Sequence, residues 1–222
     1  MQIEIKHLQK KFKRKQVLQD INLTATAGTC IGILGANGCG KSTMLSILAG
    51  VQQADGGEFL CYGVDLLKNA RERTHLVGYV PQGTPLIEEL SAKDNLLLWY
   101  DRENMNTQLQ DGVLKLLGID EFLKVPVCKM SGGMKKRLSI GCAMAKHPPV
   151  LLLDEPTAAL ELVCKEHIAS YLSTYKAGGG ILLLTTHDPA EVAMCDVTYI
   201  LKDGVLVPFC FDGDMQKLVA SL

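Results

Sequence analysis

Apolar and polar residues alternate along the first part of the chain. Ile3 and Ile5, and later Ile21 and Leu23, are each separated by a single polar residue. Successive side chains of a strand point to opposite faces, so this pattern predicts antiparallel strands with one buried face. Between the two runs, residues 10–15 form a basic stretch with one aromatic residue, where we expect a turn.

Four later segments are apolar at almost every position: 30–34, 76–80, 150–153 and 181–185. Strands that are buried on both faces have this composition, and their alternation with helices is typical of a parallel sheet. We expect helices at 42–49, which Gly50 ends, and at about 163–175.

The middle and the end of the chain have other patterns. From about 88 to 146, apolar residues recur at intervals of three and four, which predicts helices. At the end, the pair Asp203-Gly204 lies between apolar runs at 197–201 and 205–207. Asp-Gly favours the tight turns of hairpins, so these runs predict two antiparallel strands.

Composition fits one globular domain in a reducing compartment. Of the 222 residues 47% are apolar, and the formal net charge of −1 gives no reason to expect nucleic acid as a partner. The eight cysteines are scattered, and we interpret them as reduced thiols, mostly buried, in a cytosolic protein. No signal segment is recognised, and no apolar run approaches the roughly 20 residues of a membrane-spanning helix.

A glycine-rich loop follows the strand expected at 30–34. Residues 35–42 read Gly-Ala-Asn-Gly-Cys-Gly-Lys-Ser, which matches G-x-x-x-x-G-K-[ST] between a strand and a helix. In this motif, backbone N–H groups and the helix N-terminus surround phosphate oxygens. We expect Lys41 to bind the β- and γ-phosphates of a nucleoside triphosphate, Ser42 to bind Mg²⁺ and Thr43 to reach the α-phosphate. The other predicted binding positions of this phosphate loop are Gly35, Asn37, Gly38, Cys39 and Gly40.

An acidic pair, Asp154-Glu155, ends the strand expected at 150–153. A carboxylate at the end of a buried strand is unfavourable unless a partner satisfies it, and a hydrated Mg²⁺ does so, which suggests this role for Asp154. Glu155 would then lie beyond the γ-phosphate, where a general base polarises the attacking water. The alternative is a pair of capping acids at a strand end.

Together with Ser131-Gly132-Gly133, these two motifs resemble those of the ABC-family nucleotide-binding domains, over essentially the whole chain. The resemblance implies an α/β fold: a P-loop NTPase (RecA-like) core with a mostly parallel sheet, an N-terminal antiparallel β subdomain and an inserted α-helical subdomain. It implies one domain over 1–222, in which 1–82 and 148–222 form the core and about 83–147 the helical subdomain.

The resemblance also implies that Ser131, Gly132 and Gly133 lie at a helix N-terminus and bind ATP held by a second subunit. Two copies would then enclose two ATP molecules. A hydroxyl group, two glycines that allow close approach and a helix N-terminus make a reasonable anion site. Such a site has no phosphate-binding loop of its own, which is why we expect it to act across a dimer.

Three further positions match functional residues of the family. Gln82 matches the glutamine that contacts Mg²⁺ and the attacking water and links to the helical subdomain. His187 matches the histidine that contacts the γ-phosphate, and Phe12 the aromatic residue that stacks on adenine, although a core or surface phenylalanine is the alternative. The implied catalytic residues are Glu155, His187, Gln82 and Lys41, and the implied metal ligands are Ser42, Gln82 and Asp154.

Two positions depart from the family pattern. Met134 replaces a glutamine and precedes basic residues, which resembles a branch serving two-component exporters whose membrane subunit is a separate chain. Glu161 replaces an aspartate and adds one methylene, enough to shift a contact across the dimer. Within the phosphate loop, Cys39 either fills its position as a small residue or is a redox-sensitive thiol.

The predicted function is that of an ATP-hydrolysing subunit, with ATP and Mg²⁺ as cofactors, that drives a separate membrane-spanning permease. It would form a homodimer, or a heterodimer with a second ATP-binding subunit, in the cytoplasm at the inner face of the cell membrane. Residues 85–100, with Leu86, Leu90, Leu96, Leu97 and Trp99, form either the docking surface for the permease or core of the helical subdomain.

Two other functions stay open. One is a soluble ABC ATPase that is not coupled to transport, although long coiled coils and a second cassette are both missing from this chain. The other is a weakly or non-hydrolysing regulatory subunit, which Met134 and Glu161 would fit and Glu155 would not. A GTPase is disfavoured because no N-K-x-D motif for guanine selection is found.

Overall fold

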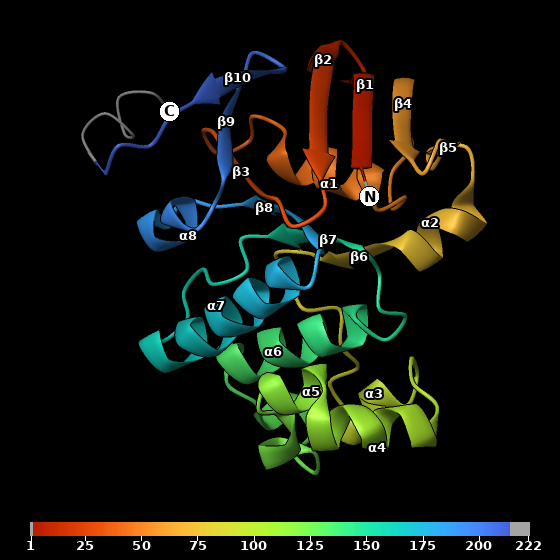
Figure 1. The fold of residues 1–222 in the computed structure, drawn as a ribbon, viewed down its shortest axis with the longest axis vertical. Coiled ribbons are helices and arrows are strands. Elements are labelled where there is room, and N and C mark those ends of the chain that lie inside the picture. Colours follow the sequence, from red (N-terminus) through yellow and green to blue (C-terminus); the bar gives the residue numbers. More distant parts are fainter. Residues whose placement is uncertain (1, 214–222) are drawn as a thin grey trace.

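The computed structural model describes residues 2–213, which form a mixed sheet with helices packed on it (Figure 1). Within these residues, ten strands follow the order β5-β4-β1-β2-β10-β9-β3-β8-β7-β6. The strands are β1 (Gln2–Phe12), β2 (Lys15–Thr26), β3 (Cys30–Leu34), β4 (Gly56–Cys61), β5 (Val64–Asp65), β6 (Val77–Val80), β7 (Val150–Asp154), β8 (Ile181–Thr185), β9 (Val197–Lys202) and β10 (Val205–Phe209). The helices are α1 (Lys41–Leu48), α2 (Ala70–Leu76), α3 (Ala92–Leu96), α4 (Arg102–Asp111), α5 (Val113–Leu116), α6 (Gly132–Ala143), α7 (Leu162–Ala177) and α8 (Pro189–Ala193), with short 3₁₀ turns at Ile119–Phe122 and Val127–Lys129.

The strands β9, β3, β8, β7 and β6 are parallel neighbours, as their apolar composition predicts. Strand β7 shows the reason. Val150 and Leu152 pack into the core that contains α1, whereas Leu151 and Leu153 pack into the core formed with α6 and α7. Both faces of the strand are therefore buried between layers, and every position has to be apolar.

The N-terminal strands β1 and β2 are antiparallel, and so is the hairpin of β9 and β10. The turn between β1 and β2 has fewer residues than the stretch 10–15 where it was predicted, because β1 continues through Phe12 and β2 already begins at Lys15. In the second turn, Asp203 has φ 49° and Gly204 φ 74°. Two successive positive φ angles match the twist of a tight hairpin, which explains the Asp-Gly pair there.

Four elements were not predicted from the sequence: β4, β5, α2 and α8. Leu76 was assigned to a strand, but it is the last residue of α2, and β6 begins at Val77. Strand β4 pairs with β1, with Ile3 opposite Cys61. This partner is distant in sequence, and a short strand that begins with two glycines carries little local signal.

Between β6 and β7 the helices and 3₁₀ turns form the lower part of the molecule in Figure 1. Leu96 is fully buried there, while Trp99 is 62% exposed, and Ile87 and Leu98 are exposed as well. The stretch 85–100 therefore supplies core and apolar surface together.

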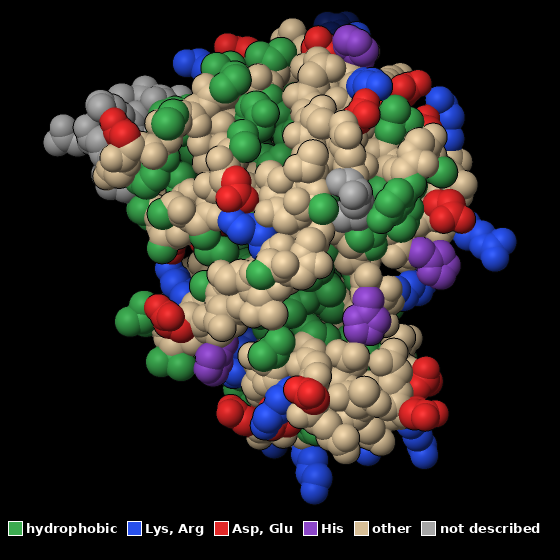
Figure 2. All heavy atoms as spheres, in the orientation of Figure 1, with side chains coloured by type: hydrophobic (Ala, Val, Ile, Leu, Met, Phe, Trp, Pro, Cys, Tyr) green, Lys and Arg blue, Asp and Glu red, His purple; other side chains and the backbone are tan. Residues whose placement is uncertain are grey.

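On the face drawn in Figure 2, acidic and basic side chains are interspersed, in line with the small net charge. Within residues 2–213, none of the helices is both long enough and apolar enough to cross a bilayer. The eight cysteines are free thiols, and five of them lie in or against the apolar cores: Cys30, Cys61, Cys142 and, in part, Cys39 and Cys195. Only Cys30, Cys61 and Cys142 are buried, fewer than predicted.

Candidate nucleotide site

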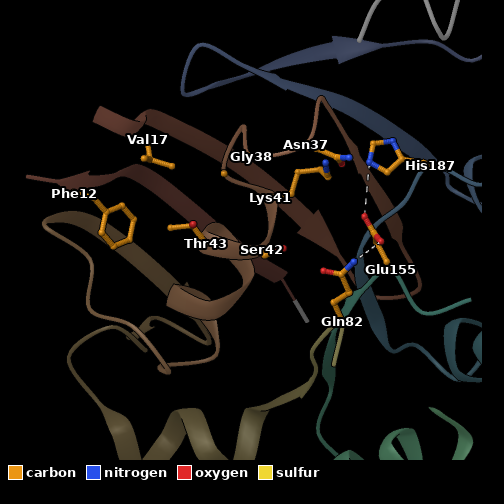
Figure 3. Close-up of a pocket in the computed structure, with 11 residues that line it drawn as sticks. Phe12, Val17, Asn37, Gly38, Lys41, Ser42, Thr43, Gln82, Glu155 and His187 are labelled. Atoms are coloured by element: carbon orange, nitrogen blue, oxygen red, sulfur yellow. Dashed lines mark hydrogen bonds and ion pairs between the residues drawn. The ribbon is translucent and has the colours of Figure 1, made fainter. Parts of the chain in front are cut away.

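A cavity of about 500 Å³ opens where the parallel strands end, beside the N-terminus of α1 (Figure 3). Its lining consists of Phe12, Val17, Asn37, Gly38, Gly40, Lys41, Ser42, Thr43, Gln82, Glu155 and His187. All of these except Val17 are residues that the sequence singled out. Figure 3 shows the phosphate loop between two groups, with Phe12 and Val17 on one side and Gln82, Glu155 and His187 on the other.

The phosphate loop depends on its glycines for a tight curve. Gly35 has φ 146°, and a Cβ atom there would lie 2.7 Å from the carbonyl oxygen of Leu201. Lys41 is buried, and its ammonium donates hydrogen bonds to the carbonyl oxygens of Gly35 at 2.6 Å and Ala36 at 3.3 Å. The loop thus curls around a positive charge, which is the arrangement a phosphate chain requires.

Cys39 lies inside the same loop and is half-buried. Its Sγ would be 2.8 Å from a Cβ atom at Gly35, so the thiol packs against the loop backbone. This contact supports the interpretation of Cys39 as a small residue that fills its position.

Thr185 organises the acidic pair, and sequence reasoning missed it. Its hydroxyl donates to Oδ1 of the buried Asp154 at 2.6 Å, and it accepts from the backbone N–H of Glu155 at 3.1 Å. Glu155 itself has φ 47°, a left-handed conformation that is strained for a residue with a side chain and is held by these bonds. The available signal was a hydroxyl residue that ends the apolar strand directly beside Asp154 in the sheet.

Glu155 lies between Gln82 and His187. The Gln82 amide Nε2 donates to Oε2 of Glu155 at 2.9 Å, and Nε2 of His187 is 3.7 Å from Oε1. Burial lowers the pKa of His187, and the charge of Lys41 acts in the same direction while Glu155 opposes it. The lowered pKa favours the neutral imidazole, which can donate one hydrogen bond and accept another.

The donor atoms available for a metal ion are oxygens. Ser42 and Gln82 line the cavity, and Asp154 is buried immediately before Glu155. A hydroxyl, an amide oxygen and one carboxylate fit Mg²⁺, which is usually held by one or two carboxylates together with substrate phosphates. In agreement with so sparse a set, the described residues contain no cluster of three or more His, Cys, Asp or Glu that could hold a metal by itself.

The Ser-Gly-Gly segment, residues 131–133, does not line this cavity. Ser131 caps α6 and accepts from the N–H of Met134 at 3.2 Å, and both Ser131 and Gly132 are exposed. Gly133 is buried, and a Cβ atom there would come within 2.2 Å of Sγ of Cys164. The helix N-terminus is thus open to solvent at a place away from the phosphate loop of the same chain.

A family model described as ABC transporter matches residues 18–158 of this chain, which is more than half of the chain's length. The chain belongs to the ABC transporter family. This match confirms the predicted fold class. It also confirms the prediction that the chain is an ATP-binding cassette of the ATPase class.

Two curated relatives and one solved structure illustrate the match. The chain is 34% identical to the Nod factor export ATP-binding protein I of Sinorhizobium fredii, with 91% of this chain and 60% of that protein covered. It is 33% identical to the spermidine/putrescine import ATP-binding protein PotA of Spiroplasma citri, with 92% of this chain and 60% of that protein covered. A dimeric ATP-binding cassette in a post-hydrolysis state, bound to ADP and Pi, matches with a TM-score of 0.83 at 26% identity, covering 96% of this chain and 100% of that one. The chain thus spans about three fifths of the length of these two curated relatives.

Proposed function

We propose that this ABC cassette hydrolyses ATP and drives export through a separate membrane-spanning subunit. The observation that carries the proposal is Glu155, which lies beside the phosphate loop with Gln82 and His187 in contact. A carboxylate at the mouth of a phosphate-binding cavity is suited to activate water. A regulatory subunit without hydrolysis would have no use for this arrangement.

In this mechanism the chain acts by positioning and by charge. Lys41 and the backbone N–H groups of the loop bind the phosphates of ATP, and Phe12 stacks on the base. Glu155 accepts a proton from the attacking water while the neutral His187 donates a hydrogen bond to the γ-phosphate. Ser42, Gln82 and Asp154 would hold Mg²⁺. When bound, the ion would supply positive charge that stabilises the negative charge developing on the transferred phosphate.

We further propose that the exposed N-terminus of α6 completes the site of a second cassette, in a homodimer or in a heterodimer with another ATP-binding subunit. The loop after the acidic pair supports this geometry, because Leu160 lies beside Gly132. A dimer would bring this loop, which includes Glu161, and the Ser-Gly-Gly segment to the same interface. Binding of ATP by one subunit would then depend on Ser131 of the other.

The exposed apolar side chains Ile87, Leu98 and Trp99 support docking to a membrane subunit. They lie in the stretch that follows Gln82, so the chain itself connects a partner bound there to the catalytic cluster. We assign the outward direction of transport because Met134 and the basic residues after it resemble the exporter branch. The Nod factor export relative agrees, whereas the import relative has similar identity, so identity alone does not decide the direction.

The test is replacement of Glu155 by Gln in the purified chain, alone and with the membrane subunit that copurifies. ATP binding should be unchanged, and steady-state phosphate release should fall by about 100-fold or more, which is the usual contribution of a general base. Glu166→Gln is the matched control, since Glu166 is an exposed glutamate on α7. Phosphate release by Glu155→Gln at the rate of the control would refute the mechanism.

A further inference from the structure

Lys136 is a buried cation on α6 to which the proposed function assigns no role. Only 4% of it is exposed, although it follows the open end of α6 by one helical turn. Its ammonium donates to the carbonyl oxygens of Pro81 at 3.0 Å and Gln82 at 3.1 Å. These two residues begin the loop that follows β6, so the bonds connect α6 to the catalytic side of the sheet.

The two basic neighbours of Lys136 serve different elements. Lys135 pairs with the exposed Glu88 at 3.2 Å, near the surface. Arg137 donates to the carbonyl oxygen of Leu117 at 3.0 Å and lies over the ring of Phe122. Arg137 Nη1 also lies 3.1 Å from Nδ1 of His167 on α7. Of the three basic residues, Lys136 is the one whose side chain bonds to the backbone of the loop that carries Gln82.

Carboxylates surround the position of Lys136. Burial lowers the pKa of Lys136, and the nearby charges of Asp154, Glu155 and Glu191 act in the opposite direction. A buried ammonium is strongly unfavourable unless its N–H groups are bonded and opposite charge is near. Both conditions are met at this place, so the side chain is held where it is and cannot move toward solvent without losing them.

A continuous path of contacts follows from these bonds. Ser131 caps the N-terminus of α6, and Lys136 lies about one turn into the same helix. Lys136 binds the backbone of Gln82, and the side chain of Gln82 binds Glu155. One end of the path, Ser131, is exposed, and the other end is Glu155, the proposed general base.

We propose that Lys136 is a positioning residue that ties the N-terminal turns of α6 to the Gln82 loop. When Ser131 engages ATP on a partner, the position of Gln82 and Glu155 in the chain's own site is set at the same time. The inference rests on the proposed function, since it needs a hydrolysing dimer. It adds a specific link, made by one side chain, between the two ATP sites of that dimer.

The first experiment compares Lys136→Met, Lys136→Arg and, as matched control, Lys135→Met in the purified chain. For Lys136→Met we expect kcat to fall by about tenfold or more with little change in ATP affinity, because a misplaced loop affects the reacting geometry and the phosphate loop is untouched. Lys136→Arg should restore most of the turnover, and Lys135→Met should keep it. Wild-type kcat in Lys136→Met would overturn the inference alone, whereas a wild-type chain without turnover would overturn the proposed function as well.

The second experiment asks whether Lys136 acts on its own site. Two differently tagged copies, Lys136→Met and Glu155→Gln, are purified as a mixed dimer, in which one site keeps an intact Glu155 and receives Ser131 from the other copy. We expect this dimer to hydrolyse ATP at least several-fold more slowly than a dimer of wild type with Glu155→Gln. Equal rates would mean that Lys136 does not position its own Gln82 and Glu155, and would overturn the inference.

Discussion

The chain presents two helix N-termini that can attract phosphate, those of α1 and α6, and their surroundings differ. At α1, Lys41 is buried in the phosphate loop, and Gln82, Glu155 and His187 arrive from the ends of other strands. At α6, Ser131 and Gly132 are exposed and contribute nothing to the cavity of their own chain. This difference is the basis of the proposal that the N-terminus of α6 completes a site in another subunit.

The N-terminus of α6 offers the strongest test of this comparison. Ser131→Ala should reduce turnover by about 100-fold, the typical effect of removing one preorganised donor to a reacting phosphate or oxyanion, and should leave ATP binding to the monomer intact. Ser91→Ala is the control, because Ser91 also caps a helix of the same region and accepts from the N–H of Asp94 at 3.2 Å. Both variants lose a cap worth about 1 kcal/mol of stability. Equal turnover in Ser131→Ala and Ser91→Ala would show that the N-terminus of α6 has no special role in turnover.

Thr185→Val tests the preorganisation of the α1 site. Valine keeps the shape but leaves a buried oxygen of Asp154 and the N–H of Glu155 without the hydroxyl. We expect the free energy of unfolding to fall by about 1 to 3 kcal/mol. Turnover should fall by about tenfold as the strained Glu155 relaxes.

Thr185→Ser is the control for that variant, since serine retains the hydroxyl. Denaturant unfolding and phosphate release measure the two effects. If Thr185→Val is as active as Thr185→Ser, the hydroxyl does not organise the acidic pair.

Phe12→Ala tests whether the side of the cavity formed by Phe12 and Val17 binds the base. Phe12 is 44% exposed at the end of β1 and lines the cavity with Val17. Loss of stacking on the base should weaken ATP binding by about tenfold, and Phe12→Tyr should retain the affinity. Tyr62→Ala removes another exposed aromatic residue and serves as control in a fluorescence titration. An unchanged Kd for ATP in Phe12→Ala would show that Phe12 is a surface residue that does not stack on the base.

The smallest expected effect concerns an ion pair next to the catalytic cluster. Lys165 on α7 lies 2.5 Å from Asp188, next to His187, and the side chains are 34% and 23% exposed. Lys165→Met should lower the free energy of unfolding by about 0.5 kcal/mol at pH 7, because solvent screens a partly exposed pair. The pair of Lys68 with Asp65 is the control: Lys68 is 75% exposed, so Lys68→Met should have a smaller effect.

The pH dependence of this pair has a defined sign. The hydrogen bond from Lys165 is the main cause that lowers the pKa of Asp188 below its usual range. The pair therefore stabilises the folded state above the unfolded pKa of about 3.9, and this stabilisation is lost as the pH falls through the lower folded pKa. The stability difference between wild type and Lys165→Met should vanish over that acid range. A difference that persists below it would show that packing, not charge, is responsible.

The sequence alone determined the elements whose signals are local. The strand, phosphate loop and helix at 30–49 follow one another without a break, and the Asp-Gly hairpin is closed by its own two turn residues. The apolar runs of β7 and β8 predicted burial on both faces before any partner was known. The phosphate loop and the acidic pair were found from their motifs and the other candidate site residues from the family resemblance, and the individual roles of all of them in catalysis stay predictions.

Tertiary structure decided the rest, because the decisive contacts join residues that are distant along the chain. Strand β4 exists through its pairing with β1. Thr185 matters only because β8 places it against Asp154. Lys136 looks like one of three surface charges in the sequence, yet folding buries it under the Gln82 loop. The sequence shows which functional side chains are available, whereas burial and hydrogen bonding across the sheet determine which of them contact one another.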